Sequence, residues 1–470
     1  MSSNYKAGEF YIESMAIVTQ SGEVVDIRRM VAVFNLHESI YDMFTYGDVA
    51  LVDTQNLLMR FQFTGQEYIR ISLRQKEGLE EKSDRDDSID KTFRISSTKN
   101  IQRIGQNTQT YVLGFHDPRL TQVEKTRLSK VFMGSYSAMA LGVMTETIKL
   151  KPEETDFWAD TLPANHQFIA PDWTVKDCIS HFVRNANTSS DAPFRNSCFF
   201  FQTLNGGFRF QDIASMYQRE HPVVWNTTPK NDDLESMERN INSSRGLNTQ
   251  IIEIHRPSSF NTLEGIRKGL YSSILRCWNP ITQQIEEHKH DIGETFKRDG
   301  HMHEAPIHLD APEITLSATD ALGSADQGYS ETEAEPALNK SFDAVVKHVD
   351  TSIHQFGNAT DINTEEPFLG EKFTDSGVLE RNALLQLLQQ NIYTVVIPFR
   401  TDLSVGTVVR LDIHEPETAK VDGIKDKLND NRYLVTALKI TGIPQDNTGV
   451  LTMDCVREGI AKKLQMSIAE

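Results

Sequence analysis

The sequence contains few cysteines, and none of them stands in a metal-binding or redox spacing. Its four cysteines, Cys178, Cys198, Cys277 and Cys455, lie far apart along 470 residues, and CxxC does not occur. This spacing argues against both a zinc knuckle and a disulfide framework. We interpret the four thiols as free and buried, because free cysteine is among the residue types most often found in protein interiors.

The sequence also lacks the short motifs by which many enzymes and nucleotide-binding proteins are recognised. GxGxxG, GxxxxGK[ST], GxSxG and HExxH are all absent. The nearest approach to a zinc-protease motif is HEAPIH, residues 303–308, in which the second histidine follows the first by five residues. At that spacing the second histidine would not share a helix face with the first, as it does in HExxH. Pro306 would also break such a helix. We therefore do not expect a zinc protease.

An excess of positive charge, a secretion signal and a membrane-spanning run are missing as well. The formal net charge is -18 at pH 7, which argues against an electrostatic grip on nucleic acid, because phosphate binding needs clustered Lys and Arg. The first residues, MSSNYKAGEFYIES, lack the basic start and apolar middle of a signal peptide. No apolar run is long enough to cross a bilayer. We expect a protein that is made and kept in a cytoplasm, without membrane insertion.

What the sequence does contain, from Glu9 onwards, is alternation of apolar and polar residues. Runs such as EFYIESMAIV, DVALVD and TYVLGFHD have a period of two and are rich in β-branched and aromatic residues, which indicates strands. Residues 1–117 are therefore predicted to form an all-β domain, a barrel or a sandwich. Polar residues mark its corners, because Asp53 and Asn56 fall where the chain reverses and Gly65 opens the next strand.

Residues 118–222 are predicted to form a small α+β domain. Apolar residues at helical spacing follow Thr174, which together with Asp177 resembles a capping box. The segment SCFFFQTLNGGFRFQDI predicts two strands joined by a turn at residues 205–207.

The remainder of the chain combines strands with a polar insertion. Residues 223–260 and 390–458 predict a second β-barrel domain, and 459–470 is a C-terminal tail. Between them, residues 261–389 form a polar α+β region with two predicted amphipathic helices, at 335–356 and 379–391. Their apolar stripes have a period of 3.6 residues and comprise Leu338, Phe342, Val345, Val349, Ile353 and Phe356 in the first helix and Leu384, Leu387 and Leu388 in the second.

The last three strands of the two predicted β domains resemble each other in order and spacing. From Gly65 the chain runs through GQEYIRISL, a charged loop, KTFRISSTKNI, a polar turn and TYVLGFHD. From Gly406 it runs through GTVVRLDI, a charged loop, NRYLVTALKITGI, a polar turn and GVLTMDCV, with Asp402 at the preceding corner. Since a shared register is a better repeat signal than residue identity, we interpret this echo as a duplicated fold. Coincidence between alternating strands is the alternative.

A histidine cluster is the one candidate for metal binding. His288 with His290, and His301 with His303, would each direct two imidazoles to the same side of a strand. A polar surface hairpin that carries histidines explains the same pattern, and we favour it because no supporting residues around the ligands can be identified. Paired carboxylates for glycoside hydrolysis need not be local, and no pair stands out. We expect no cofactor.

Three stretches resemble the baseplate hub protein of contractile-tailed, T-even-like bacteriophages. The first is HESIYDMFTYGDVALVDTQNLLMRFQFTGQEYIRISL, which has the strand, aspartate-containing turn and strand-opening glycine of the hub. The second is MGSYSAMALGVM with APDWTVKDCISHFVRNA, similar to the hub's small second domain. The third is ALLQLLQQNIYTVVIPFRTDLSVGTVVRLDI with RYLVTALKI, similar to its final barrel. The hub part of type VI secretion spike proteins shares this architecture.

The resemblance implies a non-enzymatic structural protein of the virion tail baseplate, assembled in the host bacterial cytoplasm. It implies a homotrimer with two tube-like barrels per chain, whose pseudo-sixfold ring joins the hexameric tail tube protein to the trimeric central spike protein. Contacts with baseplate wedge and tape measure proteins are implied too, and DNA would pass through the lumen without specific binding. A tail-associated cell-wall hydrolase is the alternative function.

Overall fold

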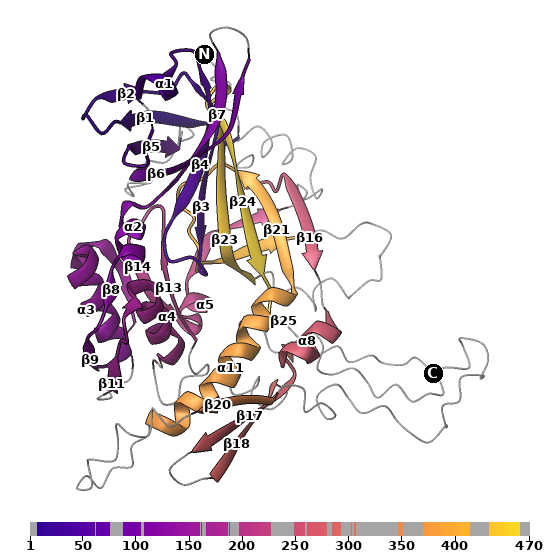
Figure 1. The fold of residues 1–470 in the computed structure, drawn as a ribbon. Helices are drawn as coiled ribbons and strands as arrows, with labels where there is room; N and C mark the ends of the chain where they lie inside the picture. The colour runs from indigo at the N-terminus through magenta and orange to yellow at the C-terminus, as the bar shows by residue number, and fades with distance from the viewer. Residues whose placement is uncertain are drawn as a thin grey trace, which may run out of the picture.

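The computed structural model describes residues 7–61, 63–75, 88–104, 108–159, 161, 166–186, 188, 197–226, 249–258, 261–279, 284–292, 302, 305–306, 346–350, 370–413 and 432–460. The described chain is mainly β, and one large sheet contains strands from both its N-terminal and its C-terminal parts (Figure 1). The predicted class, mainly β with α+β insertions, is confirmed at this level.

Thirteen strands form the large sheet. The N-terminal strands are β1 (Phe10–Val18), β2 (Val24–Asp26), β3 (Val31–Ser39), β4 (Tyr46–Asp53), β5 (Tyr68–Gln75), β6 (Ser88–Arg103) and β7 (Gln109–His116). The later strands are β15 (Glu220–Asn226), β16 (Glu253–Ser258), β21 (Ile392–Pro398), β22 (Val408–Asp412), β23 (Arg432–Ile443) and β24 (Thr448–Val456).

The strand order shows that the two predicted β domains share this sheet. Its main path runs β16-β21-β24-β23-β3-β4-β7-β6-β5-β1-β2, while β22 pairs with β23 and β15 pairs with β22. Along this path the described strands do not close into a ring. The short helix α1 (Leu57–Phe61) follows β4.

Side chains of these strands alternate between a shared core and the opposite face, as the period of two predicts. In β4, Val49 and Leu51 are buried, and in β7 Leu113 and Phe115 are buried. The same core extends into the C-terminal strands, where it includes Trp225. One continuous apolar core therefore underlies both halves of the sheet.

A smaller α+β unit packs beside the sheet (Figure 1). Its helices are α2 (Pro118–Lys125), α3 (Tyr136–Ile148), the 3₁₀ turn η1 (Pro152–Glu154), α4 (Val175–Asn185) and α5 (Ile213–Gln218). Its strands are β8 (Arg127–Leu128), β9 (Val131–Gly134), β10 (Thr155–Trp158), β11 (His166–Ile169), β12 (Trp173–Thr174), β13 (Cys198–Gln202) and β14 (Phe208–Asp212). The predicted cap of α4 is confirmed, because the Thr174 side chain accepts a hydrogen bond from the Asp177 backbone N–H.

The third part of the described chain contains α8 (Thr262–Lys268), β17 (Ser272–Asn279), β18 (Gln284–Asp291), β19 (Ala305–Pro306), β20 (Val346–Asp350), α11 (Gly370–Gln390) and β25 (Gly459–Ile460). Strands β18, β17 and β20 form a separate sheet. The predicted helix at 379–391 is confirmed by α11, in which Leu384, Leu387 and Leu388 are buried.

The predicted helix at 335–356 is wrong where the structure describes it. Val346–Asp350 is strand β20, which pairs in parallel with β17 and places Val346 opposite Ile274 and Val349 opposite Cys277. β-branched residues fit a strand as well as the apolar face of a helix. Here the pairing with β17 decides between the two and overrides the helical period of the sequence. The rest of that predicted helix lies outside the described residues.

The described cysteines agree with the sequence analysis. Cys178, Cys198 and Cys455 are free and buried. The side chain of Cys277 lies outside the described ones. No helix in the described part of the chain is both long enough and apolar enough to span a membrane.

Candidate assembly site at the junction of the two sheet halves

The two halves of the large sheet repeat one pattern of strand pairing. Neighbours run β3-β4-β7-β6-β5 in the first half and β16-β21-β24-β23-β22 in the second, and each of these pairs is antiparallel. The register repeats as well, because residues that lie opposite one another on three neighbouring strands correspond between the halves. These residues, a matched row, are Tyr68, Arg94 and His116 in the first half and Val408, Leu434 and Val456 in the second. The echo predicted from the sequence is thus confirmed in strand order and register.

A shared irregularity strengthens this correspondence. The register of β6 against β7 shifts between Ile95 and Ser97, and that of β23 against β24 shifts between Val435 and Ala437. In each half the shift begins one residue after the matched row. Bulges re-aim a strand and are retained as designed features of a fold. Two bulges at one corresponding position therefore indicate that the halves are copies of one module.

The halves join where β3 of the first lies against β23 of the second (Figure 1). Phe34–Ser39 pairs antiparallel with Ala437–Gly442. A methyl group in place of the Gly442 hydrogen would run into the ring of Phe34. Glycine therefore permits the close approach of the two strands at this point.

A buried carboxylate ties three segments together at the junction. Glu38 of β3 accepts hydrogen bonds from the backbone N–H of Leu204, between β13 and β14, and of Val405, before β22, both at 2.7 Å. Burial raises the pKa of Glu38 to about 6, against the opposing effect of these two bonds. Sequence reasoning missed this residue, although its position in phase with the apolar residues Leu36 and Ile40 was a usable signal.

The small α+β unit reaches the junction through a second buried polar group. The guanidinium of Arg209 donates to the carboxylate of Asp156 at 2.9 Å and to the backbone oxygen of Val405 at 3.3 Å. Arg209 is 3% exposed. Since a buried guanidinium needs partners for its donors, this contact fixes the unit against the segment that enters β22.

Polar side chains cross the junction on the face of the sheet that points away from the core. The amide of Asn35 donates to Asp48 at 2.9 Å, and the Thr441 hydroxyl donates to the Asn35 side-chain oxygen at 2.8 Å. The imidazole of His37 stacks on the ring of Tyr46 with centroids 4.9 Å apart. The surface over the junction is therefore polar and half-exposed.

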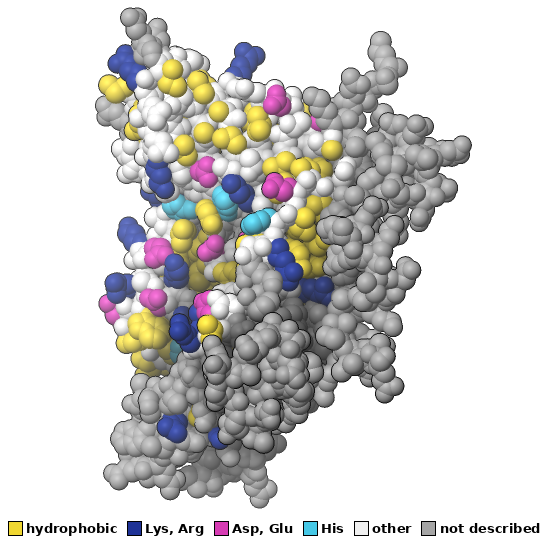
Figure 2. All heavy atoms as spheres, turned by 90° about the vertical axis from the view of Figure 1, so that its right-hand side faces the viewer, with side chains coloured by type: hydrophobic (Ala, Val, Ile, Leu, Met, Phe, Trp, Pro, Cys, Tyr) yellow, Lys and Arg dark blue, Asp and Glu magenta, His cyan; other side chains and the backbone are white. Residues whose placement is uncertain are grey.

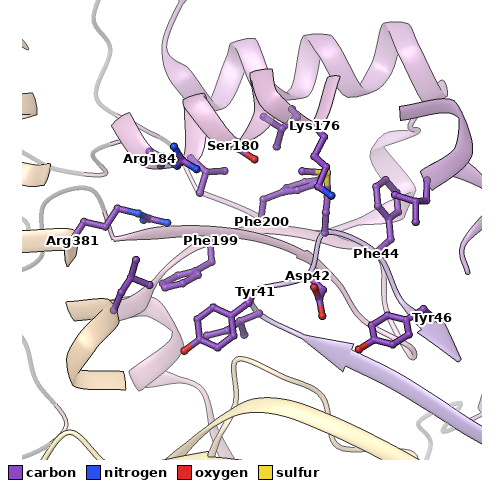
Figure 3. Close-up of a pocket in the computed structure, with 16 residues that line it drawn as sticks. Tyr41, Asp42, Phe44, Tyr46, Lys176, Ser180, Arg184, Phe199, Phe200 and Arg381 are labelled. Carbon is purple, nitrogen blue, oxygen red and sulfur yellow. The ribbon is translucent and has the colours of Figure 1, made fainter. Parts of the chain in front are cut away.

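A cleft of about 530 Å³ lies beside the junction, between the loop that joins β3 to β4, helix α4, strand β13 and helix α11 (Figure 3). Arg381 of α11 extends over the ring of Phe199 and donates to the backbone oxygen of Cys198 at 2.9 Å. Burial lowers the pKa of Arg381 to about 10. Asp42 is the one carboxylate among the described residues that line the cleft, whereas glycoside hydrolysis uses a pair of carboxyl groups.

The first group of predicted corner residues lies between β4 and β5. The Asp53 carboxylate is buried and accepts from the backbone N–H of Gln55 at 2.9 Å and of Leu57, which begins α1, at 2.7 Å. Asn56 and Gly65 have φ of 57° and 85°, a region that asparagine and glycine tolerate better than other residues.

The second group lies before β22. The Asp402 carboxylate accepts from the guanidinium of Arg400 at 2.8 Å, and its other oxygen lies 3.3 Å from the His221 imidazole. Although burial opposes ionisation, these partners hold the pKa of Asp402 well below its usual range. Gly406 has a φ of 73°. The contact between Asp402 and His221 of β15 could not be predicted from the sequence, because the two residues lie far apart in the chain.

The histidine pairs are only partly described. His288 and His290 both lie on β18, while His301 and His303 lie outside the described residues. Within the described part of the chain, no group of three or more His, Cys, Asp or Glu side chains is placed to hold a metal ion.

The chain has the fold of bacteriophage tail proteins. It is similar to a tail protein from Neisseria meningitidis MC58, with 9% identity, a TM-score of 0.50 and coverage of 96% of this chain and 98% of the other. It is also similar to the 43 kDa tail protein of prophage MuSo2 from Shewanella oneidensis, with 8% identity, a TM-score of 0.51 and coverage of 95% and 99%. No protein-family model and no curated protein matches the chain. The resemblance predicted from the sequence is thus confirmed as a likeness to the fold of phage tail proteins.

Proposed function

We propose that the chain is the structural baseplate hub of a phage tail, a homotrimer whose six sheet halves form a ring of pseudo-sixfold symmetry. The observation that carries this proposal is the repeated strand order and register of two halves within one continuous sheet. Three copies would present six similar modules to the hexameric tail tube and three identical faces to the trimeric central spike. Baseplate wedge and tape measure proteins are further proposed partners.

In this proposal the polar face of the sheet lines a channel for DNA. Asn35, Asp48 and Thr441 make that face polar at the junction. Figure 2 shows one side of the molecule, where charged side chains of both signs are interspersed with apolar ones and the coloured atoms include no continuous stripe of Lys and Arg. A wall without clustered cations lets a phosphate backbone slide past with little adhesion.

The corner residues have a structural role in the same proposal. Asp53, Asn56 and Gly65 would fix the corner of one tube-like barrel, at 1–117, and Asp402 and Gly406 that of the other, at 223–260 with 390–458. Residues 118–222, 261–389 and 459–470 would be the small domain, the insertion and the tail. The protein would act in the virion tail after assembly in the bacterial cytoplasm.

Native mass spectrometry and electron microscopy of the purified chain test the proposal. We expect a mass of three 53.3 kDa chains and class averages that show a three-fold ring with six lobes. A monomer that persists at high concentration would contradict it. A cell-wall zymogram tests the alternative, because clearing by the purified protein would show a hydrolase.

A further inference from the structure

The internal junction leaves two unmatched strand edges in the described structure. The junction pairs β3 with the second part of β23. By strand order, the counterpart of β3 is β16 and the counterpart of β23 is β6. In the described part of the chain, β16 pairs only with β21, and the part of β6 beyond Ile95 pairs only with β7. The first half thus has an open edge along the second part of β6, where β23 is covered by β3. The second half has an open edge along β16, which is the counterpart of β3.

Exposure agrees with this difference. At the junction Leu36 of β3 and Ile440 of β23 are buried, at 0% and 2% exposure. In the corresponding open stretches, His255 and Arg256 of β16 are exposed, and Ile101 of β6 is 59% exposed. An open edge with exposed apolar side chains is a template for pairing with another chain.

We propose that β16 of one copy pairs antiparallel with the second part of β6 in the next copy, so that the contact between chains repeats the β3–β23 junction within the chain. This inference rests on the proposed trimer and names its contact surface. The two edges differ, so the contact is head-to-tail and cannot form a two-fold dimer. Such contacts form a closed ring when the rotation between copies closes and an open filament when it does not, and the proposed trimer is the closed case.

The register of the proposed pairing follows from the neighbouring strands. His255 lies opposite Thr394 in β21 as Asn35 lies opposite Asp48 in β4, so His255 corresponds to Asn35. Gln102 lies opposite Thr110 in β7 as Thr441 lies opposite Val450 in β24, so Gln102 corresponds to Thr441. Asn35 and Thr441 are partners in the junction. The inference therefore places Gln102 opposite His255 of the next copy.

The two open-edge strands, β6 and β16, each contain one extra residue compared with the junction strands to which they correspond. Strand β6 has a register shift between Lys99 and Gln102, which the junction strand β23 lacks at the corresponding place. Strand β16 has a register shift between His255 and Ser258, which β3 lacks at the corresponding place. Each edge thus gains one residue over the same stretch, and the register that places Gln102 opposite His255 also places Lys99 opposite Ser258.

These matched irregularities supply specificity. Asn100, with a φ of 54°, and Pro257 fall opposite each other in this register. A bulge on one edge and a proline on the other discourage pairing with a regular strand, because both disturb the ladder of hydrogen bonds. Two edges with compensating bulges still fit each other.

Cysteine cross-linking tests the pairing. In the full-length double variant Gln102→Cys with His255→Cys, mild oxidation is expected to link chains covalently, and trimer is expected as the largest species on a denaturing gel. The matched control is Asn35→Cys with Thr441→Cys, whose parent side chains are 2.8 Å apart and which should link within one chain. Each single variant should give no ladder of linked chains.

The outcomes separate this inference from the proposed function. A trimer by native mass spectrometry without links between chains, while the control pair links, would overturn the edge pairing and leave the hub proposal standing. A monomer without links would overturn both. A ladder that continues beyond trimer would show open-ended pairing and refute the closed ring.

Discussion

Replacing Glu38 tests whether the junction depends on its buried carboxylate. In Glu38→Ala, the backbone N–H groups of Leu204 and Val405 each lose an acceptor at 2.7 Å. A buried donor left without a partner costs about 1–3 kcal/mol, so the free energy of unfolding should fall by about 2–6 kcal/mol. Glu38→Gln keeps one carbonyl acceptor and should cost about half as much.

The pH dependence of stability gives a sharper signature of Glu38. Its pKa is raised from 4.5 to about 6 in the folded protein, which corresponds to about 2 kcal/mol. Because the folded state binds the proton more tightly than the unfolded state, this group's contribution to stability increases as the pH falls from about 7 to about 4. Glu38→Gln does not titrate. Wild type should therefore gain about 2 kcal/mol relative to Glu38→Gln across this window.

Urea unfolding of both proteins at several pH values measures this difference. Hydrogen exchange of the peptides that contain Leu204 and Val405 provides a local readout, because both amides bond to Glu38. Exchange at these peptides should be faster in Glu38→Ala, while peptides of α3, distant from the junction, serve as the internal control. Parallel pH profiles for wild type and Glu38→Gln would refute the reasoning.

Two further substitutions test local features of the sheet. Gly442→Ala should destabilise the fold by about 1–3 kcal/mol, because its methyl group would meet the Phe34 ring in a packed core. Gly142→Ala is its control, since Gly142 lies in α3 with open space around it. Alanine should stabilise this helix by up to about 1 kcal/mol. Equal shifts of the melting temperature in the two variants would contradict the close approach at the junction. Asp53→Ala should cost about 2 kcal/mol or more, because the Leu57 N–H loses its buried acceptor, and unchanged urea midpoints would show that the corner does not depend on Asp53.

Local signals carried most of the fold prediction. Alternation within single strands predicted the β regions, and the Thr174 cap predicted the start of α4, because both depend on neighbours in sequence. The helix at 335–356 failed at Val346–Asp350, where the deciding contact is with β17, a strand far away in the chain. Residues that suit either structure are assigned by such distant pairing.

The junction itself could not have been predicted from either half alone. Sequence periodicity indicates which side chains of β3 and β23 face the core, but it does not indicate which strand lies beside which. The polar groups that hold the junction, Glu38 and Arg209, bind segments such as the one at Val405, which is remote in sequence. The sequence signal for Glu38 is that it falls in phase with Leu36 and Ile40, where an apolar residue is expected.

A duplicated sheet whose internal junction can be repeated between chains constrains how copies assemble. Suppose that the β3–β23 junction within a chain and the proposed β16–β6 contact between chains align corresponding residues. Neighbouring sheet halves are then rotated by a similar angle around the ring, whether they belong to one chain or to two. The ring then contains twice as many halves as chains, and three chains match a six-fold partner on one face while remaining three-fold on the other. The matched bulges at Lys99 to Gln102 and His255 to Ser258 would distinguish the steps between chains from those within them. A protein built in this way changes symmetry through one repeated contact rather than through two unrelated surfaces.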